Sequence, residues 1–343
     1  MYNRINKMSK TLNNSNMNME DKDLSLKYQQ KTDKQHILDN PDTYIGSVEK
    51  VEADLWVLSQ AKSGATEVNE TKADDKIVER NMTYIPGLFK LFDEGVVNCR
   101  DHVIRMDAAI KAGQPNCIPV SCIDISIQED GTIVMINDGN GIDVAEHPEY
   151  KVYIPELIFG HLRTSTNYNK DEKKIVGGKN GFGFKLVLIW STYGSVETVD
   201  HVRGLKYVQE FKNNLDEICK PVITKCKTKP YTKITFKPDY KRLGIEGLSP
   251  DLIALLKKRV YDISAVTDKS IKVKYNSELI PVKNFQQYID LYIGDKSTSP
   301  RVYEDDGEVG RWEYAVALTP NNEFIQVSFV NGIHTAKGGK HVE

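Results

Sequence analysis

A glycine-rich segment from Gly177 to Lys185 constrains the fold of this chain more than any other part of its sequence. It contains four glycines and two lysines in nine residues. Glycine lacks a Cβ and permits positive φ, so successive N–H groups can converge on an anion, and lysine adds positive charge. The segment therefore predicts a phosphate-binding loop, although an ordinary surface loop has a similar composition and short glycine motifs often match by chance.

The spacing of these glycines excludes the two commonest nucleotide-binding loops. A P-loop that starts at Gly178 requires a lysine where the chain has Phe184, and Lys185 comes one position late. The dinucleotide motif Gly-x-Gly-x-x-Gly that starts at Gly181 requires a glycine where the chain has Leu186. A nucleotide bound by this segment must therefore be held in another fold.

Length and composition indicate a globular protein of two domains. The chain has 343 residues, of which 40% are hydrophobic and 27% charged. Its formal net charge of −2 provides no overall attraction to nucleic acid, so any contact with DNA must come from a local patch.

The cysteines and the apolar runs predict an intracellular, soluble protein in the cytoplasm or nucleus. The five cysteines form no Cys-x-x-Cys pair, and their odd number favours free thiols in a reducing compartment. No uninterrupted apolar run is longer than that of Leu186–Trp190, which is far shorter than the roughly 20 residues of a membrane span. No signal-peptide pattern opens the chain, so no membrane partner is expected.

The clearest predicted helix covers residues 87–106. One apolar stripe recurs at helical spacing, formed by Leu88, Phe92, Val96, Cys99 and Val103. Glu94 and Asn98 are four residues apart and project together from a polar face, which is either solvated or part of a site. Gly95 favours a site, because glycine within a helix costs about 1 kcal/mol relative to alanine unless another group must approach closely.

Two strands, predicted at 122–127 and 132–136, lead into a tight turn. The turn contains Asp138 followed by Gly139 and Gly141, so it holds one carboxylate near its base. Such a turn is common as a purely structural feature. By itself it therefore does not identify a site.

The remaining pattern indicates a flexible arm, an antiparallel sheet and a second group of strands. Residues 1–25 are rich in asparagine and methionine and are expected to be disordered. Alternating strands and a helix then follow, at 196–198, 205–211, 232–238 and 249–263. New strands at 271–275, 312–317 and 325–330, with a helix at 285–292, suggest a second domain that starts near residue 265.

Three motifs, read in order, resemble the N, G1 and G2 boxes of GHKL ATPases. They are Glu94-x-x-x-Asn98, Asp138-Gly139-x-Gly141 and Gly178-x-x-Gly-x-Gly183. Further segments look like the N-terminal part of a type IIA DNA topoisomerase, and they resemble eukaryotic, viral and phage members more than bacterial gyrase. These segments are His36–Gly46, Phe92–Glu94, Leu157–Gly160, Ser165–Tyr168, Gly177–Gly181, Phe329–Ile333 and Lys337–His341. The resemblance covers the chain from about residue 26 to its end.

This resemblance implies an α+β fold. Residues 26–264 would form a GHKL (Bergerat) two-layer α/β sandwich with an N-terminal strap. Residues 265–343 would form the beginning of a transducer domain, similar to domain 2 of ribosomal protein S5 and apparently truncated.

The resemblance also implies roles for the matched residues. Glu94 would be the general base for the attacking water, Asn98 would offer its amide oxygen to Mg²⁺, and Asp138 would accept a hydrogen bond from adenine. Tyr28 would reach the nucleotide of the partner subunit. The other nucleotide contacts would come from Ser165, Thr166, Asn167, Gly178, Lys179, Asn180, Gly181, Phe182, Gly183, Phe184 and Lys185, with Lys185 adding charge.

The implied function is an ATP-binding and ATP-hydrolysing gate that forms a homodimer on ATP and drives passage of double-stranded DNA. This chain alone is not expected to cleave DNA, so it would need a cleavage and religation region in the same enzyme or in a separate subunit. The alternative is a GHKL ATPase that acts as an ATP-dependent clamp or regulator without topoisomerase activity.

Some positions depart from the family pattern. Lys179 stands where eukaryotic members usually have arginine, and Phe182 and Phe184 replace the usual tyrosine and alanine, which adds bulk beside the phosphates. The family's Gln-Thr-Lys loop, whose lysine touches the γ-phosphate, does not occur before Glu343. Turnover by this chain is therefore expected to be slow.

Overall fold

The computed structural model describes residues 31–59, 76–162, 183–306, 312–319 and 323–343. The chain divides into two compact units, Met1–Asn40 and Pro41–Glu343. In the first unit, helix α3 (Asp33–Asp39) begins after Thr32, whose hydroxyl oxygen accepts a hydrogen bond from the Gln35 amide at 3.2 Å. This N-cap satisfies one of the amides that a helix leaves free at its start.

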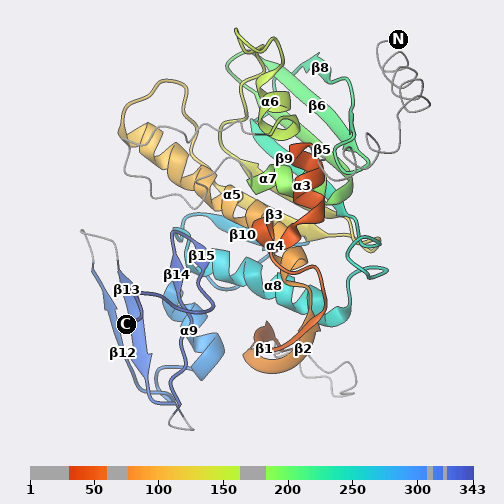
Figure 1. The fold of residues 1–343 in the computed structure, drawn as a ribbon. Coiled ribbons are helices and arrows are strands. Elements are labelled where there is room, and N and C mark those ends of the chain that lie inside the picture. The colour runs from red at the N-terminus through yellow and green to blue at the C-terminus, as the bar shows by residue number, and fades with distance from the viewer. Residues whose placement is uncertain (1–30, 60–75, 163–182, 307–311, 320–322) are drawn as a thin grey trace, which may run out of the picture. The chain divides into compact units, whose positions relative to one another are not determined.

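The second unit is built on one large mixed sheet (Figure 1). Its main path runs β11 (Glu278–Leu279), β10 (Lys272–Tyr275), β3 (Cys122–Ile127), β4 (Ile133–Asp138), β9 (Tyr231–Pro238), β5 (Ser191–Asp200), β6 (Leu205–Lys212) and β7 (Glu217–Ile218), and β8 (Val222–Lys225) pairs with β6. All these pairs are antiparallel except β10 with β3. The predicted antiparallel strands of the middle of the chain thus belong to the same sheet as β3 and β4.

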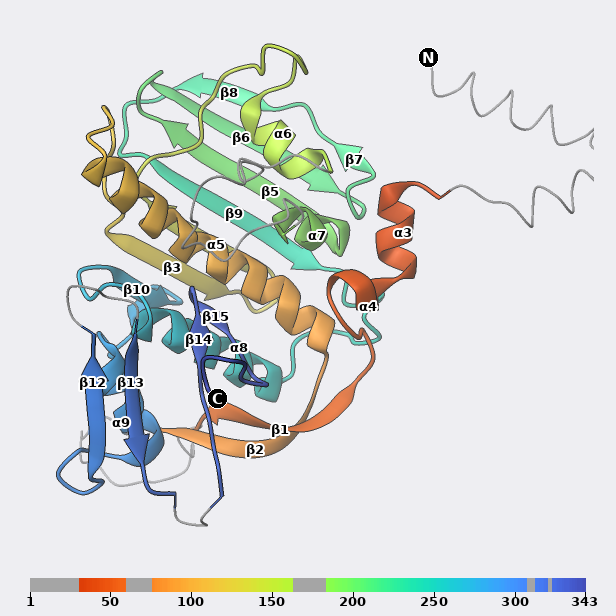
Figure 2. The same ribbon diagram turned by 60° about the vertical axis from the view of Figure 1, so that its left-hand side comes forward.

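Helices α5 (Pro86–Lys111) and α7 (Gly183–Ile189) cover the same face of this sheet (Figure 2). On α5, a Cβ placed on Gly95 would overlap the side chain of Met135 in β4. On α7, Phe184 packs edge-on against Phe236 of β9, with 5.7 Å between ring centres. Because Ile133 of β4 pairs with Phe236, Met135 and Phe236 lie on one face, which is the face toward both helices.

Local signals explain where the long helices begin and end. Helix α5 has Pro86 at its first position, where the missing N–H costs nothing. It ends before Gly113, whose φ of +68° suits the left-handed residue that closes many helices. Helix α8 (Pro250–Ala265) begins after Ser249, whose hydroxyl accepts from the Leu252 amide at 3.2 Å. The predicted helices at 87–106 and 249–263 are confirmed.

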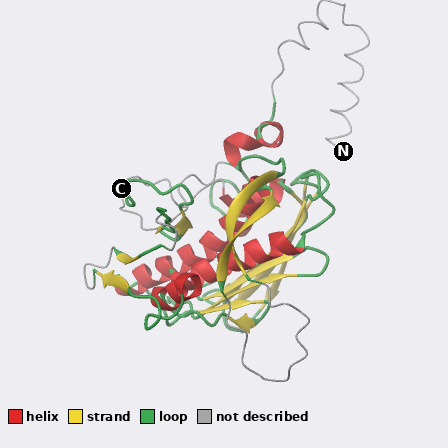
Figure 3. Ribbon diagram, turned by 90° about the horizontal axis from the view of Figure 1, so that it is seen from below, coloured by secondary structure: helices red, strands yellow, loops and turns green. Residues whose placement is uncertain are grey.

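Helix α8 lies beside α5 and also contacts a separate hairpin of β1 (Val51–Leu58) and β2 (Ile77–Tyr84). Buried residues from the hairpin and the helix form one cluster, which contains Val57, Met82, Ala254 and Leu255. Figure 3 shows the same helices and strands from below. None of the helices in the described parts of the chain has the length and apolarity that a bilayer crossing requires.

The C-terminal part contains α9 (Phe285–Ile293) and two short hairpins, β12 (Arg301–Asp305) with β13 (Glu313–Ala317) and β14 (Phe329–Val330) with β15 (Ile333–His334). Strand β10, which was expected to open a second domain, pairs with β3 of the large sheet through Val273 and Ile123. The expected domain limits of 26–264 and 265–343 therefore stay predictions. Helix α6 spans Ile154–Gly160.

Candidate functional site

The polar face of α5 carries Glu94 and Asn98, one turn apart and both partly exposed. The Glu94 side chain is 20% exposed and forms an ion pair with Lys90 on the preceding turn, with 2.6 Å between Nζ and Oε1. Gly95 next to it lies against Met135 and Phe184, so the reason for glycine here is the close packing of α5 on β4 and α7.

The end of the glycine-rich segment reaches the same helix face. A Cβ on Gly183, the first residue of α7, would lie only 2.5 Å from Oε2 of Glu94. The backbone of Gly183 therefore passes directly against this carboxylate. Glycine is the residue that permits this approach without displacing the side chain.

The next two residues of α7 are buried. Phe184 packs edge-on between Phe159 and Phe236, with 5.6 and 5.7 Å between ring centres, so its side chain belongs to the core and adds no bulk beside a ligand. Lys185 is only 3% exposed, and this burial lowers the pKa of its amine to about 8. An amine with a pKa of about 8 exchanges between its charged and neutral forms near physiological pH.

Asp138, at the end of β4, directs its carboxylate to the beginning of β3. Oδ1 accepts from the amides of Ser121 and Cys122 at 2.7 and 2.8 Å, and Oδ2 accepts from the Ser121 hydroxyl. The carboxylate thus holds β3 and β4 together at this end of the sheet.

Asn137 lies on the face of β4 that α5 covers, because it is two residues beyond Met135. It pairs with Thr232 of β9, which in turn pairs with Thr198 of β5. Paired residues point to the same face, so Asn137, Thr232 and Thr198 form a polar row across three strands. All three are buried, and the hydroxyls of Thr198 and Thr232 are 3.0 Å apart. This row was not predicted from the sequence, although Asn137 directly precedes Asp138.

The turn after Asp138 packs on the neighbouring strand and on α5. A Cβ on Gly141 would overlap the Val199 carbonyl oxygen, and the next amide, of Ile142, donates to the Thr198 hydroxyl at 2.9 Å. A Cβ on Gly139 would lie 3.3 Å from Nε2 of His102 in α5. Both glycines therefore permit close packing, and Gly139 also has a φ of +89°.

These contacts align α5 with β4. Gly95 lies against Met135 and His102 lies against Gly139, so the helix and the strand run in the same direction. Asn98 is consequently at the level of Asn137. The structure thus brings together Glu94, Asn98 and Gly183 near the polar row, whereas it directs the Asp138 carboxylate elsewhere.

The other predicted contacts lie outside the described residues. They are Tyr28, Ser165, Thr166, Asn167, Gly178, Lys179, Asn180, Gly181 and Phe182. Within the described ranges no group of three His, Cys, Asp or Glu side chains could hold a metal ion. A Mg²⁺ ion that takes one oxygen from Asn98 and the others from phosphate and water would not require such a group.

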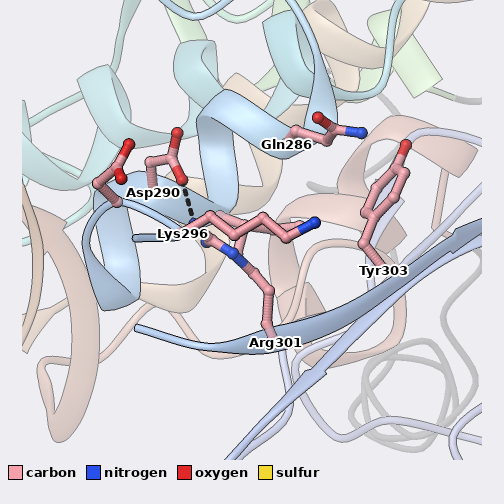
Figure 4. A pocket seen from close by; sticks show the side chains of 7 residues that line it. Gln286, Asp290, Lys296, Arg301 and Tyr303 are labelled. Atoms are coloured by element: carbon pink, nitrogen blue, oxygen red, sulfur yellow. Dashed lines mark hydrogen bonds and ion pairs between the residues drawn. The ribbon is translucent and has the colours of Figure 1, made fainter. Parts of the chain in front are cut away.

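A cavity of about 240 Å³ lies between α9 and β12 (Figure 4). Arg301 lines it and donates from Nη2 to Asp290 at 2.6 Å and to the Gly294 carbonyl at 3.1 Å. None of the predicted site residues that the structure describes lines this cavity. It is therefore separate from the polar face of α5.

Comparison with known proteins gives close relatives over nearly the whole chain. The chain is 42% identical over 339 residues to DNA topoisomerase 2 of Acanthamoeba polyphaga mimivirus and 44% identical over 323 residues to that of Arabidopsis thaliana. These matches cover 98% and 92% of this chain but only 25% and 20% of the relatives. The chain thus spans a quarter or less of these curated relatives. No protein-family model matches it.

Solved structures show the same fold. The ATPase region of Saccharomyces cerevisiae topoisomerase II is 41% identical, with a TM-score of 0.81, and the match covers 93% of this chain and 78% of that one. The ATPase and transducer domains of topoisomerase II from Balamuthia mandrillaris are 38% identical, with a TM-score of 0.78, and the match covers 92% and 74%.

The mixed sheet, with α5 and α7 on one face and a glycine segment that enters α7, is the fold of the GHKL ATPases. The predicted α+β fold class is confirmed. The chain belongs to the type II DNA topoisomerase family, in which it corresponds to the ATPase region.

Proposed function

We propose that this chain binds ATP on the sheet face covered by α5 and hydrolyses it with Glu94 as the general base. The observation that carries the proposal is the contact between Gly183 and Glu94. It places the end of a glycine-rich segment, suited to phosphate, directly against a carboxylate that can accept a proton from water.

Each group on α5 and α7 has a role that fits its chemistry. The Glu94 carboxylate leaves its ion pair with Lys90 and accepts a proton from the attacking water. Asn98, one turn further, would hold Mg²⁺ through its amide oxygen. The bound ion would offset the negative charge of the phosphate oxygens. Gly183 and Phe184 offer backbone amides to the phosphates, and Lys185 adds charge when it is protonated.

We assign the contact with the adenine base to Asn137 instead of Asp138. The Asp138 carboxylate already accepts three hydrogen bonds from Ser121 and Cys122, whereas Asn137 lies on the face of the proposed site beside Thr232. An amide offers one acceptor and two donor hydrogens, which matches the mixed donors and acceptors of a purine edge.

The remaining nucleotide contacts are proposed on the family resemblance. Ser165, Thr166 and Asn167 would contact ribose and phosphates, the segment from Gly178 to Phe182 would wrap the triphosphate, and Tyr28 would reach the nucleotide of a second copy. Lys179, Asn180 and Gly181 belong to that wrapping segment.

The variant Glu94→Gln tests the proposed function. It keeps the size and polarity of the side chain but removes the proton acceptor, so a non-hydrolysable ATP analogue should bind normally while hydrolysis falls about 10²- to 10⁴-fold. Asp107→Asn is the matched control, because Asp107 forms an exposed i,i+4 pair with Lys111 on the same helix. Wild-type turnover in Glu94→Gln would overturn the assignment.

For the whole protein we propose an ATP-driven gate for double-stranded DNA. Two copies would associate when ATP binds, and a cleavage region, in the same polypeptide or in another subunit, would cut the DNA. The name of the relatives supports this proposal, and an intracellular location in cytoplasm or nucleus is part of it. Light scattering should show a doubled mass with the ATP analogue. A clamp or regulator, the alternative, would also dimerise but would not pass DNA when the cleavage region is supplied.

A further inference from the structure

Helix α5 has a second polar face, which carries Asp93 and Arg100 and differs from the face of Glu94. Asp93 and Arg100 are seven residues apart, so they lie nearly above one another on the helix, and Glu94 is rotated by about 100° from Asp93. The Asp93 carboxylate is buried and accepts from Nε of Arg259 in α8 at 2.6 Å. Asp93 and Glu94 are adjacent, so any shift of one displaces the other.

Arg259 binds a second group with another nitrogen of its guanidinium. Its Nη2 donates to the carbonyl oxygen of Gly332 at 2.6 Å, and the side chain has no exposed surface. Gly332 lies in the two-residue turn between β14 and β15. The φ angles of Asn331 and Gly332 are +51° and +79°, as in the Asn-Gly turns that suit tight hairpins.

The same turn also touches α5 directly. A Cβ on Gly332 would overlap the side chain of Arg100, whose Nε donates to the Val266 carbonyl at 3.0 Å. The turn is therefore seated between an arginine of α5 and an arginine of α8. Its position depends on both helices.

The ion pair extends from Arg259 to α9. Asp262 lies 3.9 Å from Nη1 of Arg259, accepts from Lys258 at 3.1 Å, and accepts from the Tyr288 hydroxyl at 2.5 Å. The buried charges of Asp93 and Asp262 are thus balanced by those of Lys258 and Arg259. Buried ion pairs add little net stability relative to apolar packing, so their directional bonds are the more important contribution here.

We propose that Arg259 is a positioning residue that couples the β14–β15 hairpin to the orientation of Glu94. Through its hydrogen bonds to Gly332 and Asp93, Arg259 links the turn between β14 and β15 to α5, the helix that carries Glu94. A movement of the hairpin therefore shifts α5, and a ligand that orders α5 restrains the hairpin. This inference rests on the proposed function, because it requires Glu94 to act in hydrolysis.

The variant Arg259→Lys tests the coupling. Lysine keeps the positive charge but has a single nitrogen at its end, so it cannot bind Asp93 and the Gly332 carbonyl from two fixed nitrogens. Its matched control is Arg301→Lys, since Arg301 is also a buried arginine (side chain 5% exposed) that binds one carboxylate and one glycine carbonyl. Arg301 lies by the cavity of Figure 4, which is separate from the proposed nucleotide site.

Three quantities are measured in each variant: the Kd of a non-hydrolysable ATP analogue, the kcat and KM of ATP hydrolysis, and the hydrogen exchange of residues 329–335 with and without the analogue. We expect wild type and Arg301→Lys to gain exchange protection in 329–335 on binding. Arg259→Lys should keep its Kd within about threefold, lose this protection, and lower kcat about ten- to a hundredfold.

A second variant covers the case in which Arg259→Lys does not fold. Gly332→Ala places a methyl group against the flexible Arg100 side chain and leaves the pair of Asp93 with Arg259 intact. It should displace the turn and lower kcat in the same way. Normal kcat and normal protection in either folded variant would overturn the coupling, as would an equal loss of kcat in Arg301→Lys. If wild type does not bind the analogue, the proposed function itself has failed.

Discussion

Gly183 and Glu94 are in contact across the proposed site, so close that a Cβ on the glycine would lie 2.5 Å from a carboxylate oxygen. The variant Gly183→Ala should therefore displace the Glu94 carboxylate. Because that group is the end of a flexible side chain, we expect little change in melting temperature but a fall in kcat of about tenfold or more. The control is Gly247→Ala, where the added methyl group meets open space. Equal kcat in both variants would contradict the role of this contact.

Substitutions of the adjacent residues Asn137 and Asp138 test which of the two contacts the adenine base. Asn137→Ala should weaken binding of the ATP analogue about tenfold or more and reduce the preference for adenine over guanine nucleotides, at a small cost in stability. Isothermal titration with both nucleotides measures this.

Asp138→Asn should lower stability and leave nucleotide affinity unchanged, which is the reverse of the result expected for Asn137→Ala. It replaces the oxygen that accepts from the Ser121 hydroxyl with an NH2 group, and it removes the negative charge from the oxygen that accepts from the Ser121 and Cys122 amides. We therefore expect the free energy of unfolding to fall by about 1–3 kcal/mol. Nucleotide affinity of the folded fraction should be unchanged. If Asp138→Asn instead loses nucleotide affinity and keeps its stability, Asp138 is the adenine contact.

The lowered pKa of Lys185 predicts that nucleotide affinity depends on pH. Burial lowers the pKa of its amine to about 8, so the free protein loses this positive charge as the pH rises through 8. Bound triphosphate favours the charged form. The Kd should therefore increase above pH 8, by at most about tenfold per pH unit. Lys185→Arg, which stays charged, should show a flat profile up to pH 9, and an identical slope in both proteins would refute this role.

The lowered pKa of His102 predicts that the folded protein loses stability in acid. Burial, with a smaller effect of the nearby Arg105 charge, lowers the pKa of its ring to about 4. Between this pKa and the ordinary value of 6.5, the unfolded chain binds a proton that the folded chain does not. Stability should thus decrease as the pH falls from about 6.5 to 4, by at most about 1.4 kcal/mol per pH unit. His102→Gln should reduce the slope of melting temperature against pH in this range. Partly buried His334, with a pKa also lowered to about 4, should retain part of the slope.

Much of the fold could be predicted from the sequence because its signals are local. The apolar stripe of α5, the Ser249 cap of α8 and the alternation of β9 depend on residues a few positions apart. The pairing of β10 with β3 could not be predicted in this way. Ile123 and Val273 are distant in sequence, and no local pattern shows which edge of a sheet a later strand will join.

The sequence by itself determined that Glu94 and Asn98 share a helix face and that the glycine segment is neither a P-loop nor a dinucleotide loop. Both conclusions follow from spacing along one segment. Tertiary structure alone decided that Asn137, and not Asp138, faces α5, because a strand offers two faces and only packing selects between them. It also decided that Arg259 joins Asp93, 166 residues away, to Gly332, 73 residues away, since only the folded chain brings these groups together.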